Sequence, residues 1–162
     1  MDGQVFGLSD AESRLWISLT VLSQILTPTL DTRLRRVGLT HFEYGALIAL
    51  SEGPHRTLRI GEMSERLYAP LPRVSRVIAR LEGRGLVSRE TSGSDARASD
   101  IELTREGRQV MIDALPVHAA AAKAFILDEL SSEQIRTLAD ILEPVVLRLD
   151  PSGPLSDGSP TK

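Results

Sequence analysis

The segment 71–104 constrains the fold of this chain more than any other part of the sequence. In its first half, 71–84, aliphatic residues recur at three- and four-residue steps, a period that predicts an amphipathic helix. Four arginines follow similar steps on another face of the same helix: Arg73, Arg76, Arg80 and Arg84. The expected helix therefore has one face suited to burial and one basic stripe suited to solvent.

Two short strands are expected after this helix. Alternating aliphatic and polar residues in 98–104 predict a half-buried strand, which would pair with a strand at 86–91. The polar segment 92–96 has the residue types of a turn. With a shorter helix at about 59–67 and a turn at 68–72, this is the layout of a winged helix-turn-helix. The fold class expected is therefore mainly α-helical with a small β-hairpin wing, and such a module places one helix in the major groove of DNA.

Long helices are expected on both sides of this module. Capping boxes mark three helix starts, at 9–12, 40–43 and 131–134. The first helix should run from about 10 to 36 with a bend at Pro28, and the helix that begins after Thr104 should kink at Pro116. We therefore divide the chain into an N-terminal dimerisation helix (1–38), a winged helix-turn-helix domain (39–104), C-terminal dimerisation helices (105–149) and a disordered tail (150–162).

The distribution of charge is more informative than its total. The net charge of −3 argues at first against a nucleic-acid partner. The segment 56–108, however, holds 11 arginines and eight acidic residues, a net of +3, so the rest of the chain carries −6. Seventeen of the 19 basic residues are arginine, the side chain suited to bidentate contacts with phosphate and guanine. A basic module within an acidic chain is compatible with specific DNA binding.

Several kinds of site find no support in the sequence. The chain has no cysteine, which excludes disulfides, thiolate zinc sites and thiol switches of its own. Its histidines lack the spacing of metal ligands, so neither a metal nor a cofactor is expected. No nucleophile–base pattern or phosphate-cradling glycine loop indicates an enzyme. No apolar run approaches ~18 residues and no signal peptide is visible, so we expect a cytoplasmic protein without a membrane partner.

The arginine stripe and the wing are the candidate DNA contacts. The stripe can reach phosphates and base edges in the major groove, although a solvated arginine face is the alternative interpretation. Arg97, near the tip of the wing, can enter a narrow minor groove, or can be an ordinary exposed turn charge. Asp95 would repel phosphate, so a structural role, in a pair with Arg80 or Arg97, explains it better.

The stretch 39–108 resembles the MarR family (multiple antibiotic resistance regulators). The matching pieces are Pro72-Arg-Val-Ser-Arg76, Arg80-Leu-Glu-Gly-Arg-Gly-Leu-Val87, and Asp95-Ala-Arg97 placed before Leu103-Thr-Arg-Glu-Gly107. The resemblance implies an obligate homodimer with intertwined terminal helices, bound to a near-palindromic operator in double-stranded DNA. Members that sense peroxide use an N-terminal cysteine, which this chain lacks.

The resemblance also implies roles for single residues. Major-groove readers would be Pro72, Arg73, Ser75 and Arg76. Arg97 would enter the minor groove and Asp95 would hold the wing to the recognition helix; Arg80 and Ser94 complete the expected DNA-binding set. Two departures concern the operator sequence rather than the binding mode: Ala96 stands where many members have arginine, and Arg73 replaces the usual small hydroxyl residue.

The terminal helices give an independent argument for a homodimer. The last helix carries seven large aliphatic residues within 15 positions, more than a small winged core can bury. A helical layer shared with a second copy would bury them. The alternative is that the first and last helices pack on each other within one chain.

A small-molecule ligand is suggested mainly by the resemblance to the family. The family often responds to small aromatic or phenolic acids in a pocket between the dimer helices and the winged domain. The candidate pocket residues are Arg14, Trp16, His41 and Tyr44. Core packing for Trp16 and Tyr44, and capping or surface roles for His41 and Arg14, are the alternatives.

The leading hypothesis is thus a dimeric, sequence-specific DNA-binding transcriptional regulator, a repressor released by a small molecule. The alternative is a winged-helix protein-interaction module without sequence-specific DNA binding. An exposed apolar face on the helix 71–84 would favour that alternative, and the arginine stripe disfavours it.

Overall fold

The computed structural model describes residues 7–91, 99–151 and 153, and these form a mainly α-helical fold with one small sheet. The helices are α1 (Asp10–Leu34), α2 (His41–Glu52), α3 (Ile60–Arg66), α4 (Leu71–Glu82), α5 (Arg105–Phe125) and α6 (Ser132–Leu149). The strands are β1 (Thr57–Arg59), β2 (Val87–Thr91) and β3 (Ser99–Leu103), and short 3-10 turns lie at Arg35–Val37, Pro54–Arg56 and Leu127–Glu129. The fold class expected from the sequence, a winged helix-turn-helix flanked by long terminal helices, is confirmed.

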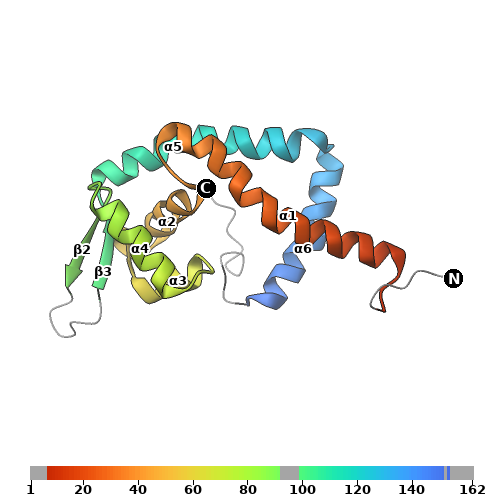
Figure 1. Cartoon of the computed structure of the whole chain (residues 1–162), viewed down its shortest axis with the longest axis horizontal. Helices are drawn as coiled ribbons and strands as arrows, with labels where there is room; N and C mark the ends of the chain where they lie inside the picture. Colours follow the sequence, from red (N-terminus) through yellow and green to blue (C-terminus); the bar gives the residue numbers. More distant parts are fainter. Residues whose placement is uncertain (1–6, 92–98, 152, 154–162) are drawn as a thin grey trace.

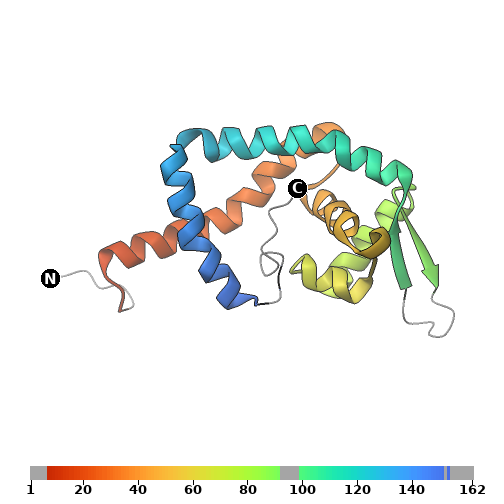
Figure 2. The ribbon, with the colours of Figure 1, turned by 180° about the vertical axis from the view of Figure 1, so that it is seen from behind.

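The winged module and the long helices occupy different parts of the molecule. In Figure 1, α2, α3, α4 and the β2–β3 hairpin cluster at one end, and α5 runs from the hairpin along the top to α6. Figure 2, from behind, shows the N-terminal half of α1 extending away from this cluster. The terminal helices therefore form an extended platform beside the winged module.

The sheet is antiparallel, with strand order β1-β3-β2. Leu58 of β1 lies opposite Ile101 of β3, and Val87 of β2 lies opposite Leu103. The hairpin was expected from its alternating pattern, but β1 was not. With three residues, β1 is too short for an alternation to stand out in the sequence.

The hydrophobic core lies inside the winged module. The aliphatic stripe of α4 is buried there, and Val74, Ile78 and Leu81 have no exposed surface. They pack in one cluster with residues of α2, the sheet and the start of α5. Burial of this stripe fixes which face of α4 points outward, as the helical period predicts.

The first turn of α5 packs directly against the end of the helix-turn-helix. Thr104 caps α5, since its Oγ1 accepts from Gly107 N at 3.0 Å, and the same hydroxyl donates to Gly85 O at 2.8 Å. Gly107 is buried, and a Cβ added there would overlap the backbone carbonyl of Leu86. Only glycine allows this close approach.

Two prolines lie within helices without ending them, whereas Gly38 lies at a helix end. α1 and α5 each continue through the proline at which a bend is expected, Pro28 in α1 and Pro116 in α5. Gly38 adopts a left-handed conformation with φ 76°, as expected for a residue that stops a helix.

Large apolar surfaces remain exposed on the terminal helices. In α1 the exposed side chains are Leu15, Trp16, Ile17, Leu19, Val21, Leu22 and Ile25. In α6 they are Ile135, Leu138, Ile141, Leu142, Val145, Val146 and Leu149, and α6 has no buried residue. The alternative expectation, that α1 and α6 bury each other within one chain, therefore does not account for these faces.

Within the described part of the chain, one helical stretch, Arg105–Glu129, is long and apolar enough by length and composition to span a membrane, although no such segment was expected from the sequence. Such a stretch is weak evidence on its own. Met111 and Ala114 within it are buried in the core of the winged module. The first half of α5 therefore belongs to the core of the winged module.

We predict that Gly107→Ala lowers the free energy of unfolding by about 1–3 kcal/mol, because the added methyl group forces the Leu86 backbone and the start of α5 apart. Urea denaturation at constant protein concentration measures this. The matched control is Gly61→Ala in α3, where an added Cβ meets nothing within 4 Å. Equal stability of the two variants would contradict the close approach.

Candidate nucleic-acid interface

Helix α4 presents its basic stripe to solvent, as its buried stripe requires. Pro72, Arg73, Arg76 and Arg80 are exposed, and Ser75 is half-buried. Pro72 lies in the first turn of the helix, where its missing N–H costs no helical hydrogen bond. The exposed set begins at the N-terminal end of α4, the end that contacts base edges in helix-turn-helix complexes.

The first two arginines of the stripe are held by neutral partners. The guanidinium carbon of Arg73 lies 4.3 Å from the ring centroid of Phe42, a cation–π contact between α4 and α2. Arg76 donates from Nε to the carbonyl oxygen of Pro72 at 3.2 Å, along its own helix. Among the described residues, neither arginine is paired with a carboxylate.

The third and fourth arginines meet a buried carboxylate that sequence reasoning did not assign. Arg80 Nε lies 3.0 Å from Glu43 Oε1, and Arg84 Nη1 lies 3.8 Å from the same oxygen. The sequence led us to expect that Asp95 pairs with Arg80 or Arg97, and Asp95 lies outside the described residues. The described partner is Glu43, which the sequence marked only as a capping residue of α2.

The base of the wing is tied to α4 by Arg89, also missed from the sequence. Its Nε lies 3.2 Å from Glu82 Oε2, and its Nη2 donates to Ser75 O at 3.4 Å. These contacts join β2 to the recognition helix. Ser94 and Arg97, expected to contact DNA, and Asp95, expected to hold the wing, lie outside the described residues.

The candidate ligand residues do not come together within one chain. Arg14 and Trp16 are exposed on the N-terminal half of α1, whereas Asp31, whose Oδ1 accepts from His41 N at 2.5 Å, lies near the C-terminal end of α1. Trp16 and Asp31 are fifteen positions apart, about 22 Å along the helix. A pocket that includes all four residues would need a contribution from a second chain.

His41 and Tyr44 instead pack around a residue of α5. The His41 and His118 rings are stacked with centroids 5.7 Å apart, and Tyr44 stacks on His118 at 4.8 Å. Burial lowers the pKa of His41, with partial opposition from Asp31. Burial also lowers the pKa of His118, and the neighbouring His41 lowers it further. Both shifts favour the neutral form of the rings.

Two open grooves accompany these contacts. One, of about 280 Å³, lies between α1, α2 and α4 and is lined by Thr27, Asp31, Thr40, Phe42, Arg73, Arg76, Val77 and Arg80. The other, of about 570 Å³, is lined by Gln24, Ile25, Pro28, Thr29, Thr32, Arg33, Arg36 and Phe125. Both combine arginine with an aromatic ring, a lining that suits an organic anion.

Comparison with known proteins identifies the family. A model described as "MarR family" matches residues 37–98. The crystal structure of Sco3205, a MarR family transcriptional regulator from Streptomyces coelicolor in complex with DNA, is 36% identical and has a TM-score of 0.78. The match covers 90% of this chain and 95% of Sco3205. The chain belongs to the MarR family.

Two further relatives agree with this assignment. AbsC, a MarR family regulator from the same organism, is 30% identical with a TM-score of 0.77, and the match covers 88% of this chain and 96% of AbsC. The organic hydroperoxide resistance transcriptional regulator of Bacillus subtilis is 32% identical over 96 residues, or 59% of this chain. That match spans 64% of the Bacillus protein, less than two thirds of its length.

The histidine pair of this MarR family member predicts a pH-dependent stability. A pKa lower in the folded than in the unfolded state means that the unfolded chain binds more protons, so this contribution is present above about pH 6.5 and is lost as the pH falls below it. We predict that the melting temperature falls more steeply between pH 7 and 5.5 in the native protein than in His118→Gln. Scanning calorimetry of both proteins tests this, and parallel pH profiles would contradict it.

Proposed function

We propose that this MarR family member is a homodimeric transcriptional repressor that binds a near-palindromic operator in double-stranded DNA. The observation that carries the proposal is the outward arginine stripe of α4, on a fold shared over 90% of the chain with a DNA-bound relative. The protein would act in the cytoplasm, and its family consists of regulators rather than enzymes.

The exposed faces of α1 and α6 support the homodimer. Contiguous apolar surface of this extent marks an interaction site. A second copy would cover both faces with a shared helical layer, and would bring two recognition helices to bear on one duplex. Symmetric operator half-sites would then lie about one helical turn apart, roughly 34 Å.

Release by a small molecule follows from the same geometry. A ligand that binds better to a dimer with another spacing of the recognition helices lowers DNA affinity by its difference in affinity for the two states. The two arginine-lined grooves lie beside α1, which is part of the platform. Their lining supports a small aromatic acid as the class of ligand. The hydroperoxide named for the Bacillus relative is not carried over, since this chain has no cysteine.

The alternative function, a protein-interaction module, would use α4 as an apolar docking face. In the structure Val74, Val77, Ile78 and Leu81 are buried, and the outward face of α4 is mainly arginine. Phosphate and base edges suit this face better than an apolar partner.

Arg76→Ala should weaken operator binding by about 1–3 kcal/mol if Arg76 reads a base, with relaxed selectivity at one position of each half-site. Fluorescence anisotropy with an operator selected from random duplexes measures the loss. Arg136→Ala, which removes an exposed arginine from α6, is the matched control and should leave the affinity unchanged. A folded Arg76→Ala variant with native affinity would show that Arg76 is not one of the residues that contact bases.

A further inference from the structure

Glu43 is the one buried charged residue among those that the structure describes. It belongs to the first turn of α2, and its residue surface is 4% exposed. A buried carboxylate is costly unless it is paired and hydrogen-bonded, so its partners are informative.

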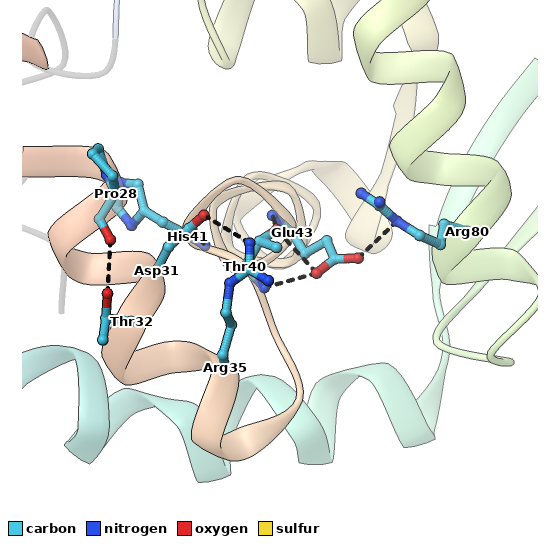
Figure 3. A network of polar contacts seen from close by, with 8 residues as sticks. All are labelled: Pro28, Asp31, Thr32, Arg35, Thr40, His41, Glu43 and Arg80. Carbon is cyan, nitrogen blue, oxygen red and sulfur yellow. Dashed lines mark hydrogen bonds and ion pairs between the residues drawn. The ribbon is translucent and has the colours of Figure 1, made fainter.

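Both oxygens of Glu43 have partners, and the two sets differ. Oε2 accepts from the backbone N–H of Thr40 at 2.7 Å and from the Thr40 hydroxyl at 2.9 Å, completing the capping box. Oε1 faces α4, where Arg80 Nε lies 3.0 Å away and Arg84 Nη1 3.8 Å away. Figure 3 shows the carboxylate between the start of α2 and the recognition helix.

The contact uses only one nitrogen of Arg80. The Arg80 side chain remains 58% exposed, and no described residue bonds its terminal nitrogens. Since Glu43 Oε1 lies against Nε, the terminal edge of the guanidinium is left available. This distinguishes Arg80 from Arg73 and Arg76, which have no carboxylate partner among the described residues.

The anchor is itself fixed by the long N-terminal helix. Asp31 of α1 accepts from the backbone N–H of His41 at 2.5 Å, so the start of α2 is held by one carboxylate from α1 and by its own Glu43. Figure 3 shows these contacts running from α1 through the start of α2 to Arg80. Arg80 is thereby positioned relative to the platform, not only within α4.

We propose that Glu43 is a specificity-determining positioning residue of the DNA-binding surface. By holding Nε of Arg80, it presents the terminal guanidinium edge to DNA in one orientation, and it restrains Arg80 and Arg84 from forming loose phosphate contacts on any sequence. This inference rests on the proposed function. Removing Arg80 from Glu43 on DNA binding would leave a buried charge poorly compensated, so the pair should persist in the complex.

Glu43→Gln separates the two roles of Glu43, since glutamine can still complete a capping box but carries no charge. The ratio of operator affinity to random-duplex affinity should fall about threefold to tenfold, the cost of ordering one long side chain on binding. The salt dependence of random-duplex binding should steepen by up to about 0.9 in log–log slope for each arginine that gains a phosphate. Glu12→Gln, in the exposed capping box of α1, is the matched control and should change neither quantity.

A double-mutant cycle with Arg80→Ala tests whether Glu43 acts through Arg80. In the Arg80→Ala background, Glu43→Gln should lower the affinity ratio by less than it does in the native protein, because only Arg84 is then released. A further fall of the same size would mean that Glu43 matters only for folding, and would overturn the proposal, as would an unchanged ratio in the single variant. Should Glu43→Gln fail to fold, Arg80→Lys keeps the charge but removes Nε; a native ratio in that variant would also overturn the proposal.

The native protein separates this proposal from the proposed function. If the native protein enriches no sequence from random duplexes, the proposed function fails. If it binds an operator selectively and the variants keep its affinity ratio, only the positioning role fails.

Discussion

Burial of the aliphatic stripe of α4 determines how the rest of the molecule is arranged. Val74, Ile78 and Leu81 are fully enclosed by the core, which leaves the opposite face of the helix for its arginines. The core that receives the stripe is assembled from α2, the sheet and the start of α5. The same packing event therefore holds the winged module together and orients its DNA-binding surface.

Polar contacts then position the arginine side chains of α4 and the base of the wing. The Phe42 ring makes a cation–π contact with Arg73, Glu43 forms an ion pair with Arg80, and Arg89 of β2 forms an ion pair with Glu82 of α4. These contacts come from α2 and β2, so the recognition surface is a property of the assembled module rather than of one helix. The terminal helices, in contrast, keep large apolar faces exposed, and these faces support assembly with a second copy.

Local patterns in the sequence predicted the local structure well. The capping boxes at Ser9, Thr40 and Ser131 are all formed, because each depends on residues three positions apart. The buried stripe of α4 and the hairpin also follow from short-range periodicity. The ion pair between Glu43 and Arg80 could not be predicted in this way, since it joins residues 37 positions apart and arises only when α2 packs beside α4.

The candidate ligand residues also show that contacts between distant parts of the sequence could not be predicted. Arg14 and Trp16 were grouped with His41 and Tyr44 as candidates near the junction of the dimer helices and the winged domain. Within one chain, however, Arg14 and Trp16 lie at the far end of α1 from the contact between Asp31 and His41. Strand β1 was missed because three residues carry too little pattern. Such features depend on tertiary or quaternary contacts, which a single sequence does not record.

The measurement that tests the central claim most directly is selection of bound sequences from a pool of random duplexes by the purified native protein, over a series of salt concentrations. The account predicts enrichment of an inverted repeat whose half-sites lie about one helical turn apart, because two copies of α4 would face one duplex in the proposed dimer. Weak, steeply salt-dependent binding with no enriched sequence would contradict it, and would leave the arginine stripe as a general phosphate-binding surface.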